Sequence, residues 1–386
     1  MLTYILSKTF INVDVMGFKI GWLTWEQRKL GEISNIYDGV HQTPNYRKTG
    51  VMFLSVENIA TLNSNKFISQ EDFHKNFKIF PEQGDILMTR IGDVGTPNVV
   101  TSTNPLAFYV SLALLKPKNV DSYFLCSSIE SPMVRRSIQR RTLVTAIPQK
   151  INKDEIGKVH IDLPSKLEEQ NKLGSLFRQI DKVVTLQQRK LDQLNTLKKG
   201  LLQKMFADKK HPKPELRFKG FSDDWEQCKF EQILISHPYK KYLASPSTNG
   251  KYKVIQQGDN PVVGWASGNP FMQYEGATLF GDHTLSLYKP TAPFFVATDG
   301  LKILTGKNIK GYYLFTLLEK NKPKSQGYKR HFNILKNEKV VITKNPEEQQ
   351  QMGCLFKQVD KTITLQQSKL DKLNSLKKSL LQTMFI

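Results

Sequence analysis

The chain has 386 residues, which is enough for two or three domains with hydrophobic cores of their own. A formal net charge of +21 and a pI of about 9.6 predict a polyanionic partner, the alternative being that the charge only keeps the chain in solution. Three scattered cysteines without a C-x-x-C pair argue against a disulfide framework or a structural zinc site and favour a reducing, cytoplasmic location.

Residues 1–17 are mildly apolar, but Lys8 and Asp14 interrupt them and no small-residue cleavage site follows. We therefore do not interpret them as a signal peptide and set them apart as an N-terminal extension. No apolar run in the chain reaches the roughly 18 residues that a membrane span requires, so no membrane partner is expected.

Residues 18–163 form a first variable block of short strands and turns. Phe108, Val110, Leu112 and Leu114 alternate at period two and so share one face, which is typical of a strand. Segment 84–95 indicates a strand that enters a glycine-rich turn, and segment 122–139 indicates a helix. Loops here combine basic, amide and aromatic side chains, which suit phosphates and base edges, although each one taken alone is an ordinary surface residue. The candidate DNA-binding residues are Gln42, Tyr46, Arg47, Lys48, Arg90, Gln149 and Lys150.

Residues 164–207 and 344–386 contain the same long helix twice. The segments 169–206 and 348–385 align without a gap, and roughly two-thirds of their positions are identical. Apolar residues recur in alternating steps of three and four, the pattern of a coiled-coil seam, and at 1.5 Å per residue each helix is about 55 Å long. The predicted seam is Ile180, Val184, Gln187, Leu191, Leu194 and Leu201 in the first copy and Val359, Ile363, Gln366, Leu370, Leu373 and Leu380 in the second.

A single helix with an exposed apolar stripe is marginal in water, so each copy needs a partner, and the other copy is the nearest one. We predict an antiparallel pair with one variable block at each end. Gln187 and Gln366 occupy the same seam position and fix the register at some cost in stability; the alternative is that they are partly exposed and specify nothing. Lysines that include Lys198 and Lys377 are expected on the outer faces, either solvated or in docking contacts.

Residues 208–343 form the second variable block, and its Trp225-Glu226-Gln227 repeats Trp25-Glu26-Gln27 of the first. Strands are expected at 252–257, 277–280, 284–288 and 294–297, and a helix at 312–318. The predicted fold class is α+β: two mixed α/β domains, mostly antiparallel, separated by two long helices that pair as an antiparallel coiled coil in a pseudo-two-fold repeat. The candidate DNA-binding residues of this block are Gln256, Gln257, Asn260, Tyr328, Lys329 and Arg330.

The sequence lacks the motifs of the common catalytic sites. The string from Gly300 to Asn308 has the wrong spacing for a phosphate-binding loop and no hydroxyl residue after its lysine, and Asn269-Pro270-Phe271 lacks the second proline of an amino-methyltransferase loop. We expect no catalytic residue, no metal and no cofactor in this chain. Two alternatives stay open: a free-standing DNA-binding protein, and an enzyme with an unrecognised nuclease centre.

Several motifs together resemble the specificity (S) subunits of type I restriction–modification systems. They are Pro214-Glu215-Leu216-Arg217-Phe218 leading to Trp225; a proline followed by Glu169-Gln170 or Glu348-Gln349; Leu-x-x-Leu-Lys-Lys-x-Leu-Leu-Gln-x-Met-Phe at each helix end; and Gly84-Asp85-Ile86-Leu87 with Arg90 and Gly92. The resemblance starts near Phe18, where residues 18–22 match residues 218–222 poorly.

The resemblance implies a fold, a function and partners. Residues 18–163 and 208–343 would be target-recognition domains that each read one half of a bipartite, asymmetric site in double-stranded DNA, and the two helices would be the spacer. Two methyltransferase (M) subunits using S-adenosylmethionine and two restriction (R) subunits using ATP and Mg²⁺ would assemble on it in the bacterial cytoplasm. This chain would be the non-catalytic member of that complex, directing adenine methylation and ATP-dependent cleavage by its partners.

Overall fold

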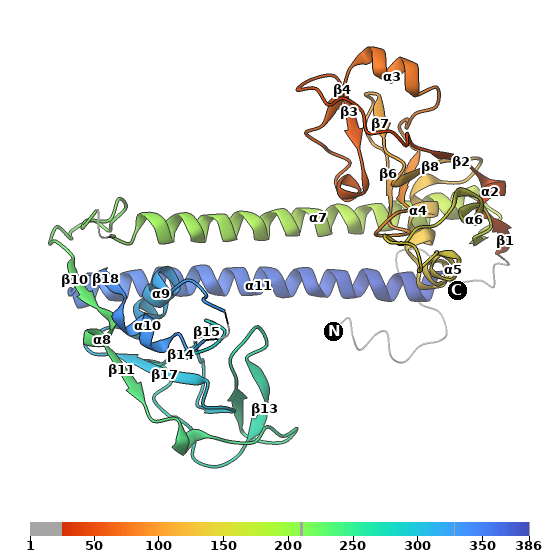
Figure 1. The fold of residues 1–386 in the computed structure, drawn as a ribbon. Helices are drawn as coiled ribbons and strands as arrows, with labels where there is room; N and C mark the ends of the chain where they lie inside the picture. The colour runs from red at the N-terminus through yellow and green to blue at the C-terminus, as the bar shows by residue number, and fades with distance from the viewer. Residues whose placement is uncertain (1–24, 209–210, 328, 386) are drawn as a thin grey trace. The chain divides into compact units, whose positions relative to one another are not determined.

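A computed structural model describes residues 25–208, 211–327 and 329–385 of the chain (Figure 1). The extension predicted at residues 1–17 and the candidate Tyr328 lie outside the described residues. The chain divides into two compact units: unit 1 is Met1–Leu186 together with Leu370–Ile386, and unit 2 is Gln187–Lys369. Each unit therefore combines one mixed domain with part of both long helices, whereas the sequence predicts five consecutive segments.

The two repeated helices are α7 (Leu167–Lys204) and α11 (Pro346–Met384). Both lie within the predicted segments 164–207 and 344–386, and each begins two residues before the aligned repeat. Pro346 is the first residue of α11, a position where a missing N–H costs nothing, and the side chain of Asn345 accepts hydrogen bonds from the backbone N–H groups of Glu347 and Glu348 at 3.0 and 3.2 Å. No helix among the described residues is long and apolar enough to cross a membrane.

Unit 1 contains three small sheets. They are the pair β1-β9, the four-stranded sheet β2-β8-β5-β6 and the three-stranded sheet β4-β3-β7. All their pairings are antiparallel except β3 with β7. The elements are β1 (Glu26–Lys29), α2 (Leu30–Ile33), β2 (Ser34–Asp38), β3 (Val51–Leu54), η1 (Val56–Asn58), β4 (Phe67–Ile68), α3 (Gln70–Asn76), β5 (Ile86–Thr89), β6 (Pro97–Val99), β7 (Leu106–Phe108), β8 (Leu112–Pro117), α4 (Ser122–Glu130), α5 (Pro132–Arg141), α6 (Lys153–Gly157) and β9 (His160–Leu163).

Two predicted elements of unit 1 are each divided. The alternating run that ends at Leu114 is two strands in different sheets, because the chain turns between β7 and β8, where the N–H of Leu112 bonds to the carbonyl of Tyr109 at 2.9 Å. The predicted helix 122–139 is α4 followed by α5. Ser131 ends α4 and its hydroxyl accepts from the N–H of Val134, so that Pro132 begins a new helix.

Unit 2 has the same kind of architecture. Its sheets are β10-β18, β11-β17-β14-β15 and β13-β12-β16, and only β12 with β16 is a parallel pair. The expected strand 284–288 is shorter, because only its last two residues pair. The elements are β10 (Glu226–Lys229), α8 (Phe230–Ile233), β11 (Leu234–His237), η2 (Lys240–Tyr242), β12 (Tyr252–Ile255), β13 (Val262–Ala266), β14 (Thr278–Gly281), β15 (Leu287–Tyr288), β16 (Phe294–Val296), β17 (Leu301–Gly306), α9 (Gly311–Asn321), α10 (Phe332–Asn337) and β18 (Lys339–Ile342).

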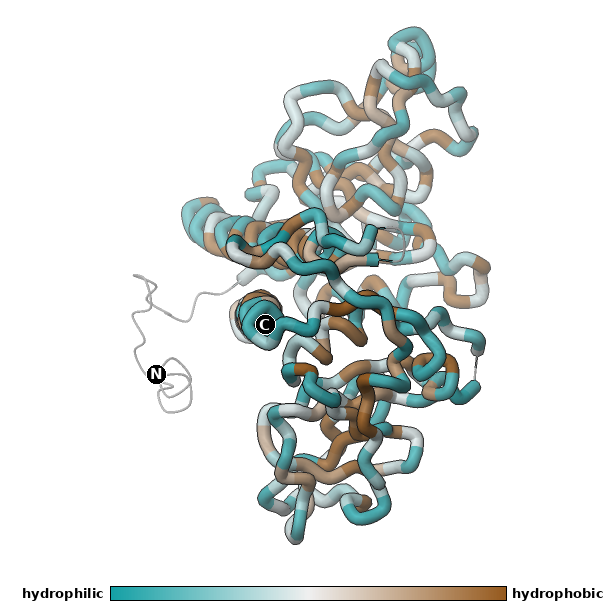
Figure 2. Tube along the Cα trace, turned by 90° about the vertical axis from the view of Figure 1, so that its left-hand side faces the viewer, coloured by the Kyte–Doolittle hydropathy of each residue, from teal (hydrophilic) through white to brown (hydrophobic). Residues whose placement is uncertain are grey.

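The long helices contribute directly to the core of each unit. In unit 1, Phe177 near the start of α7 and Phe385 just after the end of α11 share a cluster with Phe124, and Trp25 packs edge-on against Phe124 and Phe385. Since the beginning of one helix meets the end of the other, the two helix segments are antiparallel. Figure 2 shows the hydrophobic stretches of the trace gathered inside the domains and the hydrophilic ones on outer loops.

Unit 2 repeats this cluster with the helices exchanged. Phe206, just after the end of α7, packs against Phe356 near the start of α11, at 5.7 Å between ring centroids. Trp225 and Tyr313 complete the cluster, as Trp25 and Phe124 do in unit 1. The repeated sequence thus gives each domain an equivalent aromatic attachment to the helices.

The residues predicted for the helix seam are all buried or half-buried. At the centre, the side-chain amide of Gln366 donates to the side-chain oxygen of Gln187 at 2.7 Å and to its backbone carbonyl at 3.0 Å. Gln366 is only 7% exposed, so an unpaired amide here would be costly. The pair therefore favours the register that brings these two residues together.

The glutamine of the Glu-Gln pair at the start of each long helix connects that helix to a domain. Gln170 donates to the carbonyl of Pro164 at 2.9 Å and accepts from the N–H of Asp121, the N-cap of α4, at 3.2 Å. Gln349 makes the same two contacts in unit 2, with the carbonyl of Thr343 and the N–H of Lys310. Gly174 allows the close approach in unit 1, because a Cβ there would lie 2.0 Å from a carboxylate oxygen of Asp121.

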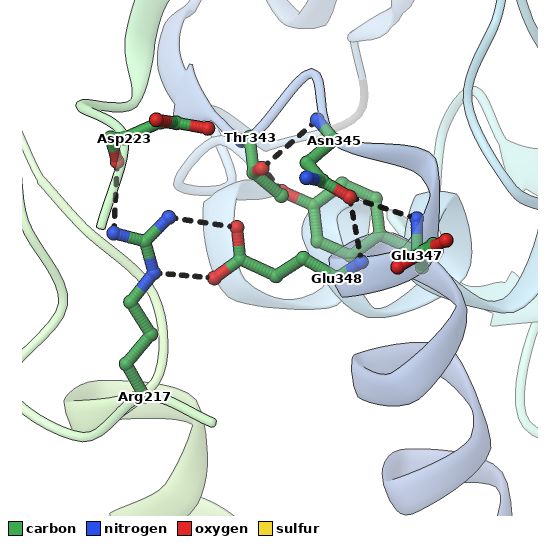
Figure 3. Close-up of polar contacts among 7 residues, drawn as sticks. Arg217, Asp223, Thr343, Asn345, Glu347 and Glu348 are labelled. Carbon is green, nitrogen blue, oxygen red and sulfur yellow. Dashed lines mark hydrogen bonds and ion pairs between the residues drawn. The ribbon is translucent and has the colours of Figure 1, made fainter. Parts of the chain in front are cut away.

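Glu348 is fully buried and is neutralised by a residue of the motif that precedes the second domain. Arg217 donates to both carboxylate oxygens of Glu348, at 2.6 and 3.0 Å, and also to the carbonyl of Asp223 at 2.8 Å (Figure 3). A two-point pair of this kind fixes orientation as well as charge. The segment between α7 and Trp225 is thereby held against the first turn of α11.

Lys198 and Lys377, expected on outer faces, are instead the centres of two equivalent ion-pair clusters. Lys377 contacts Glu130 of α4 at 2.7 Å and Asp181 of α7 at 2.6 Å. Lys198 contacts Glu319 of α9 at 2.6 Å and Asp360 of α11 at 2.7 Å. Each cluster thus joins both long helices to one domain helix within a single unit.

Electrostatics keeps both lysines charged although they are largely buried. Burial lowers the pKa of Lys377, but the Glu130 and Asp181 carboxylates outweigh it, so the pKa is raised above its usual value. The pKa of Lys198 is raised in the same way, against burial, by Asp360 and Glu319. The sequence pattern alone did not reveal these contacts, because both partners of each lysine are far away along the chain.

Replacing Lys377 with methionine, which keeps the apolar stem, is expected to lower the free energy of unfolding by about 1–2 kcal/mol, because Glu130 and Asp181 are left facing each other. The expected loss of stability is small because 47% of the Asp181 side chain is exposed, where solvent screens its charge. Urea unfolding followed by circular dichroism measures the change. Lys378→Met, at the adjacent exposed lysine, is the control and should stay within about 0.5 kcal/mol of the wild type. Equal midpoints for the two variants would contradict a stabilising cluster.

Replacing both Gln187 and Gln366 with leucine is expected to raise the free energy of unfolding by about 1 kcal/mol, because a polar seam pair secures register at the expense of stability. Urea unfolding compares this double variant with Gln193→Leu, a change at an exposed position of α7. A double variant less stable than the wild type would mean that the pair contributes net stability.

Candidate nucleic-acid interface

The first candidate group lies on the loop between β2 and β3. Gln42, Tyr46, Arg47 and Lys48 are all exposed. The backbone N–H of Arg47 bonds to the carbonyl of Phe67 at 2.7 Å, so the loop is fixed to the edge of a sheet. Its side chains are therefore presented to solvent on an ordered base, as contacts to a phosphate backbone require.

An additional cation stands beside this group. Lys66 Nζ lies 5.6 Å from the centre of the Tyr46 ring, and it also pairs with Glu57 at 2.6 Å. The sequence pattern does not indicate Lys66, because it is the bridge between Arg47 and Phe67 that brings Lys66 next to Tyr46.

Arg90 has a structural position that differs from that of the other candidates. It is 7% exposed, forms an ion pair with Asp38 at the end of β2, and donates from Nε to the carbonyl of Ile151 at 3.1 Å. A base edge has no access to its buried guanidinium. The prediction that Arg90 contacts DNA is therefore revised: Arg90 holds the segment that carries two other candidates.

Those two candidates, Gln149 and Lys150, are exposed and are fixed against the turn after β5. The N–H of Gly92 bonds to the carbonyl of Gln149 at 2.9 Å, and the Gln149 side chain donates to the carbonyl of Gly92 at 3.0 Å. Gly92 has a φ of +82°, a conformation that favours glycine. Tertiary structure thus brings together the Gly84–Gly95 turn and the Gln149-Lys150 pair.

The glutamines of unit 2 are less accessible than predicted. Gln256 donates to the carbonyl of Asn260 at 3.3 Å within the same loop. Gln257 accepts from the N–H of His283 at 3.0 Å, and its side chain packs so closely on Gly300 that a Cβ there would lie 2.4 Å from its amide nitrogen. Only Asn260 of the three is exposed. Gln256 and Gln257 stabilise the loop, and Asn260 is its remaining candidate for DNA contact.

Lys329 and Arg330 are exposed and precede a buried anchor. The backbone N–H of His331 bonds to the carbonyl of Asp282 at 2.8 Å, and the next N–H, of Phe332, bonds to the Asp282 carboxylate at 2.7 Å. Lys302 Nζ lies 3.6 Å from the other carboxylate oxygen. Arg330 is also held, by an ion pair with Asp299 at 3.2 Å.

The anchors of the two units are structurally equivalent but carry opposite charges. Arg90 directly follows β5 and Asp282 directly follows β14, and the backbone carbonyl of each accepts the N–H of the residue that follows a pair of candidate residues. That residue is Ile151 after Gln149-Lys150 and His331 after Lys329-Arg330. Two unlike domains therefore present a candidate pair at the same place in the fold.

In each arginine pair of α5, one arginine contacts another part of unit 1 and the other is exposed. Arg135 donates to the carbonyl of Val94 at 3.2 Å, and Arg141 pairs with Glu155 at 3.4 Å. Arg136 and Arg140 are exposed and line, with His160, a shallow cleft of about 360 Å³. Their charges are available to an anion such as a DNA phosphate.

Within the part of the chain that the structure describes, no group of three or more His, Cys, Asp or Glu side chains is close enough to hold a metal ion. The candidate interface residues are cationic, amide and aromatic side chains on loops.

Replacing Lys48 with glutamine is expected to leave the unfolding midpoint unchanged. It should reduce by about one the slope of log DNA affinity against log salt concentration on duplex DNA.

Arg90→Gln is expected to lower the free energy of unfolding by about 2–3 kcal/mol, because Asp38 and the Ile151 carbonyl lose a buried partner. Fluorescence anisotropy at several salt concentrations and urea unfolding supply the two measurements. An Arg90 variant with wild-type stability and altered DNA affinity would restore Arg90 as a contact residue.

Comparison with known proteins finds a family model, a relative and a solved structure that this chain resembles. The family model "Type I restriction modification DNA specificity domain" matches residues 23–196. The MjaX specificity subunit, assigned to a type I restriction enzyme of Methanocaldococcus jannaschii, is 23% identical over 404 residues, which cover 92% of each chain. The crystal structure of the type I restriction–modification S subunit from M. genitalium has the same fold, with a TM-score of 0.71 at 14% identity over 96% of this chain and 98% of that one. The chain is thus similar in sequence and in fold to specificity subunits of type I restriction–modification systems.

Proposed function

We propose that this chain reads a bipartite, asymmetric site in double-stranded DNA, with one half-site for the domain of each unit. The observation that carries the proposal is the equivalent placement of Gln149-Lys150 and Lys329-Arg330 on two domains whose sequences differ. One frame that presents different side chains at the same place is suited to reading two different half-sites. The net charge of +21 favours binding to the phosphate backbone.

The proposed candidate residues fall into two classes by geometry. Gln42, Tyr46, Arg47, Lys48, Gln149 and Lys150 in unit 1 are exposed to solvent, as are Asn260, Lys329 and Arg330 in unit 2, with one side-chain contact each for Gln149 and Arg330. Lysine and arginine bind phosphates and guanine edges, while asparagine and glutamine bind adenine edges in the major groove. The anchored residues Arg90, Gln256 and Gln257 act by holding these loops.

We further propose the complex that the family suggests. Two methyltransferase subunits using S-adenosylmethionine and two restriction subunits using ATP and Mg²⁺ assemble with this chain. They carry out adenine methylation and ATP-dependent cleavage at the site that it selects. In this proposal the chain itself supplies no catalytic residue and binds no cofactor, and the complex works in the bacterial cytoplasm.

The test is co-expression of the full chain with a cognate methyltransferase subunit, followed by sequencing that detects N6-methyladenine. The expected result is one interrupted, asymmetric motif that disappears when this chain is omitted. Replacing residues 25–163 with the corresponding block of a relative is expected to change only one half of that motif.

Three results would count against the proposal. A change in both halves after the block exchange would contradict independent reading by the two domains. No methylation despite a stable complex would contradict an active specificity role. Tight DNA binding by the isolated chain, without complex formation, would favour a free-standing DNA-binding protein.

A further inference from the structure

Unit 1 has an exposed apolar loop tip beside its candidate DNA-binding residues. Leu143, Val144 and Ile147 follow α5 and have exposed fractions of 44%, 71% and 101%. Single exposed aliphatic residues are common on protein surfaces, but three within five residues form a patch. None of the three contributes to a hydrophobic core cluster of the unit. Folding of unit 1 therefore does not account for their apolar character.

The tip is held firmly at its base. The N–H of Leu143 bonds to the carbonyl of Lys150 at 2.7 Å, and the N–H of Ala146 turns back to the carbonyl of Leu143 at 3.3 Å. One residue beyond, the N–H of Ile151 bonds to the carbonyl of Arg90. The apolar side chains are therefore displayed by an ordered loop. Because the loop is already ordered, it loses little conformational entropy when a partner binds.

The surroundings of the tip are cationic. Arg140 and the ion-paired Arg141 precede it, and the exposed Gln149 and Lys150 follow it. A polyanion suits these flanks better than a neutral protein surface does. Aliphatic side chains that enter a DNA groove contact thymine methyl groups or wedge between base steps.

We propose that Leu143, Val144 and Ile147, with Ile147 foremost, make apolar contact with base pairs of the half-site read by unit 1. The cationic flanks bind the neighbouring phosphates and so carry the tip into the groove. The inference rests on the proposed DNA-reading function and adds a contact that carries no charge and no hydrogen bond.

The contact is specific to one half-site. The segment at the equivalent place in unit 2, residues 322–330, contains no aliphatic residue except Pro323, which is buried. Lys322, Lys324 and Lys329 make that segment strongly basic. This segment of unit 2 therefore offers polar, charged and aromatic groups in place of an aliphatic tip, and the contact proposed for unit 1 has no counterpart there.

Ile147→Ser in the full chain, assembled with the methyltransferase subunit, tests the inference. The probes are a duplex that carries the methylated motif and a duplex of unrelated sequence. Specific affinity is expected to fall roughly tenfold, as loss of a buried aliphatic contact predicts, with no change in affinity for the unrelated duplex. The salt slope should be unchanged, whereas Lys150→Gln should reduce it by about one.

Ile79→Ser, at another exposed isoleucine of unit 1, is the matched control and is expected to leave both affinities unchanged. An Ile147→Ser variant with wild-type specific affinity would overturn the inference. An equal loss on both duplexes with a smaller salt slope would also overturn it, as would failure to assemble, which would identify the tip as a protein contact. A wild-type complex that prefers no duplex would refute the proposed function itself, a result separate from these.

Discussion

Burial of the apolar edge of the two long helices is the constraint on which the rest of the structure depends. Neither helix can cover that edge alone, and each domain covers part of it with one aromatic cluster, built on Phe124 in unit 1 and on Tyr313 in unit 2. The helices are therefore part of the core of each domain. This explains why the compact units divide both helices, and why the repeated residues recur where the domains attach.

Polar contacts determine how that apolar attachment is aligned. Hydrophobic packing tolerates small shifts, whereas a buried lysine between two carboxylates does not. Lys377 and Lys198 impose the same geometry in the two units, and the Gln187–Gln366 pair adds a register contact at the seam. The repeated frame thus combines a non-directional source of stability with directional contacts that select one arrangement.

The domains vary where the frame does not constrain them. Arg90 and Asp282 occupy the same position after equivalent strands and perform the same task with opposite charges, each with its own partner, Asp38 or Lys302. Because each anchor is satisfied within its own domain, exchanging a domain leaves neither anchor without its partner. The loops that these anchors hold are then free to differ, and in unit 1 they include an apolar tip that unit 2 lacks.

The sequence by itself determined the elements that depend on local pattern: the two helices, their seam, the mixed α/β class and the resemblance to specificity subunits, because periodicity and repeated motifs are properties of neighbouring residues. It placed most strands but joined segments that turns divide, at Tyr109 and Ser131. For the candidate interface it identified residue types but not their accessibility. Burial of Arg90 and Gln257, the ion pairs of Lys198 and Lys377, and the neighbourhood of Gln149 and Gly92 were decided only by the tertiary structure, because their partners are distant in the chain and differ between the two domains.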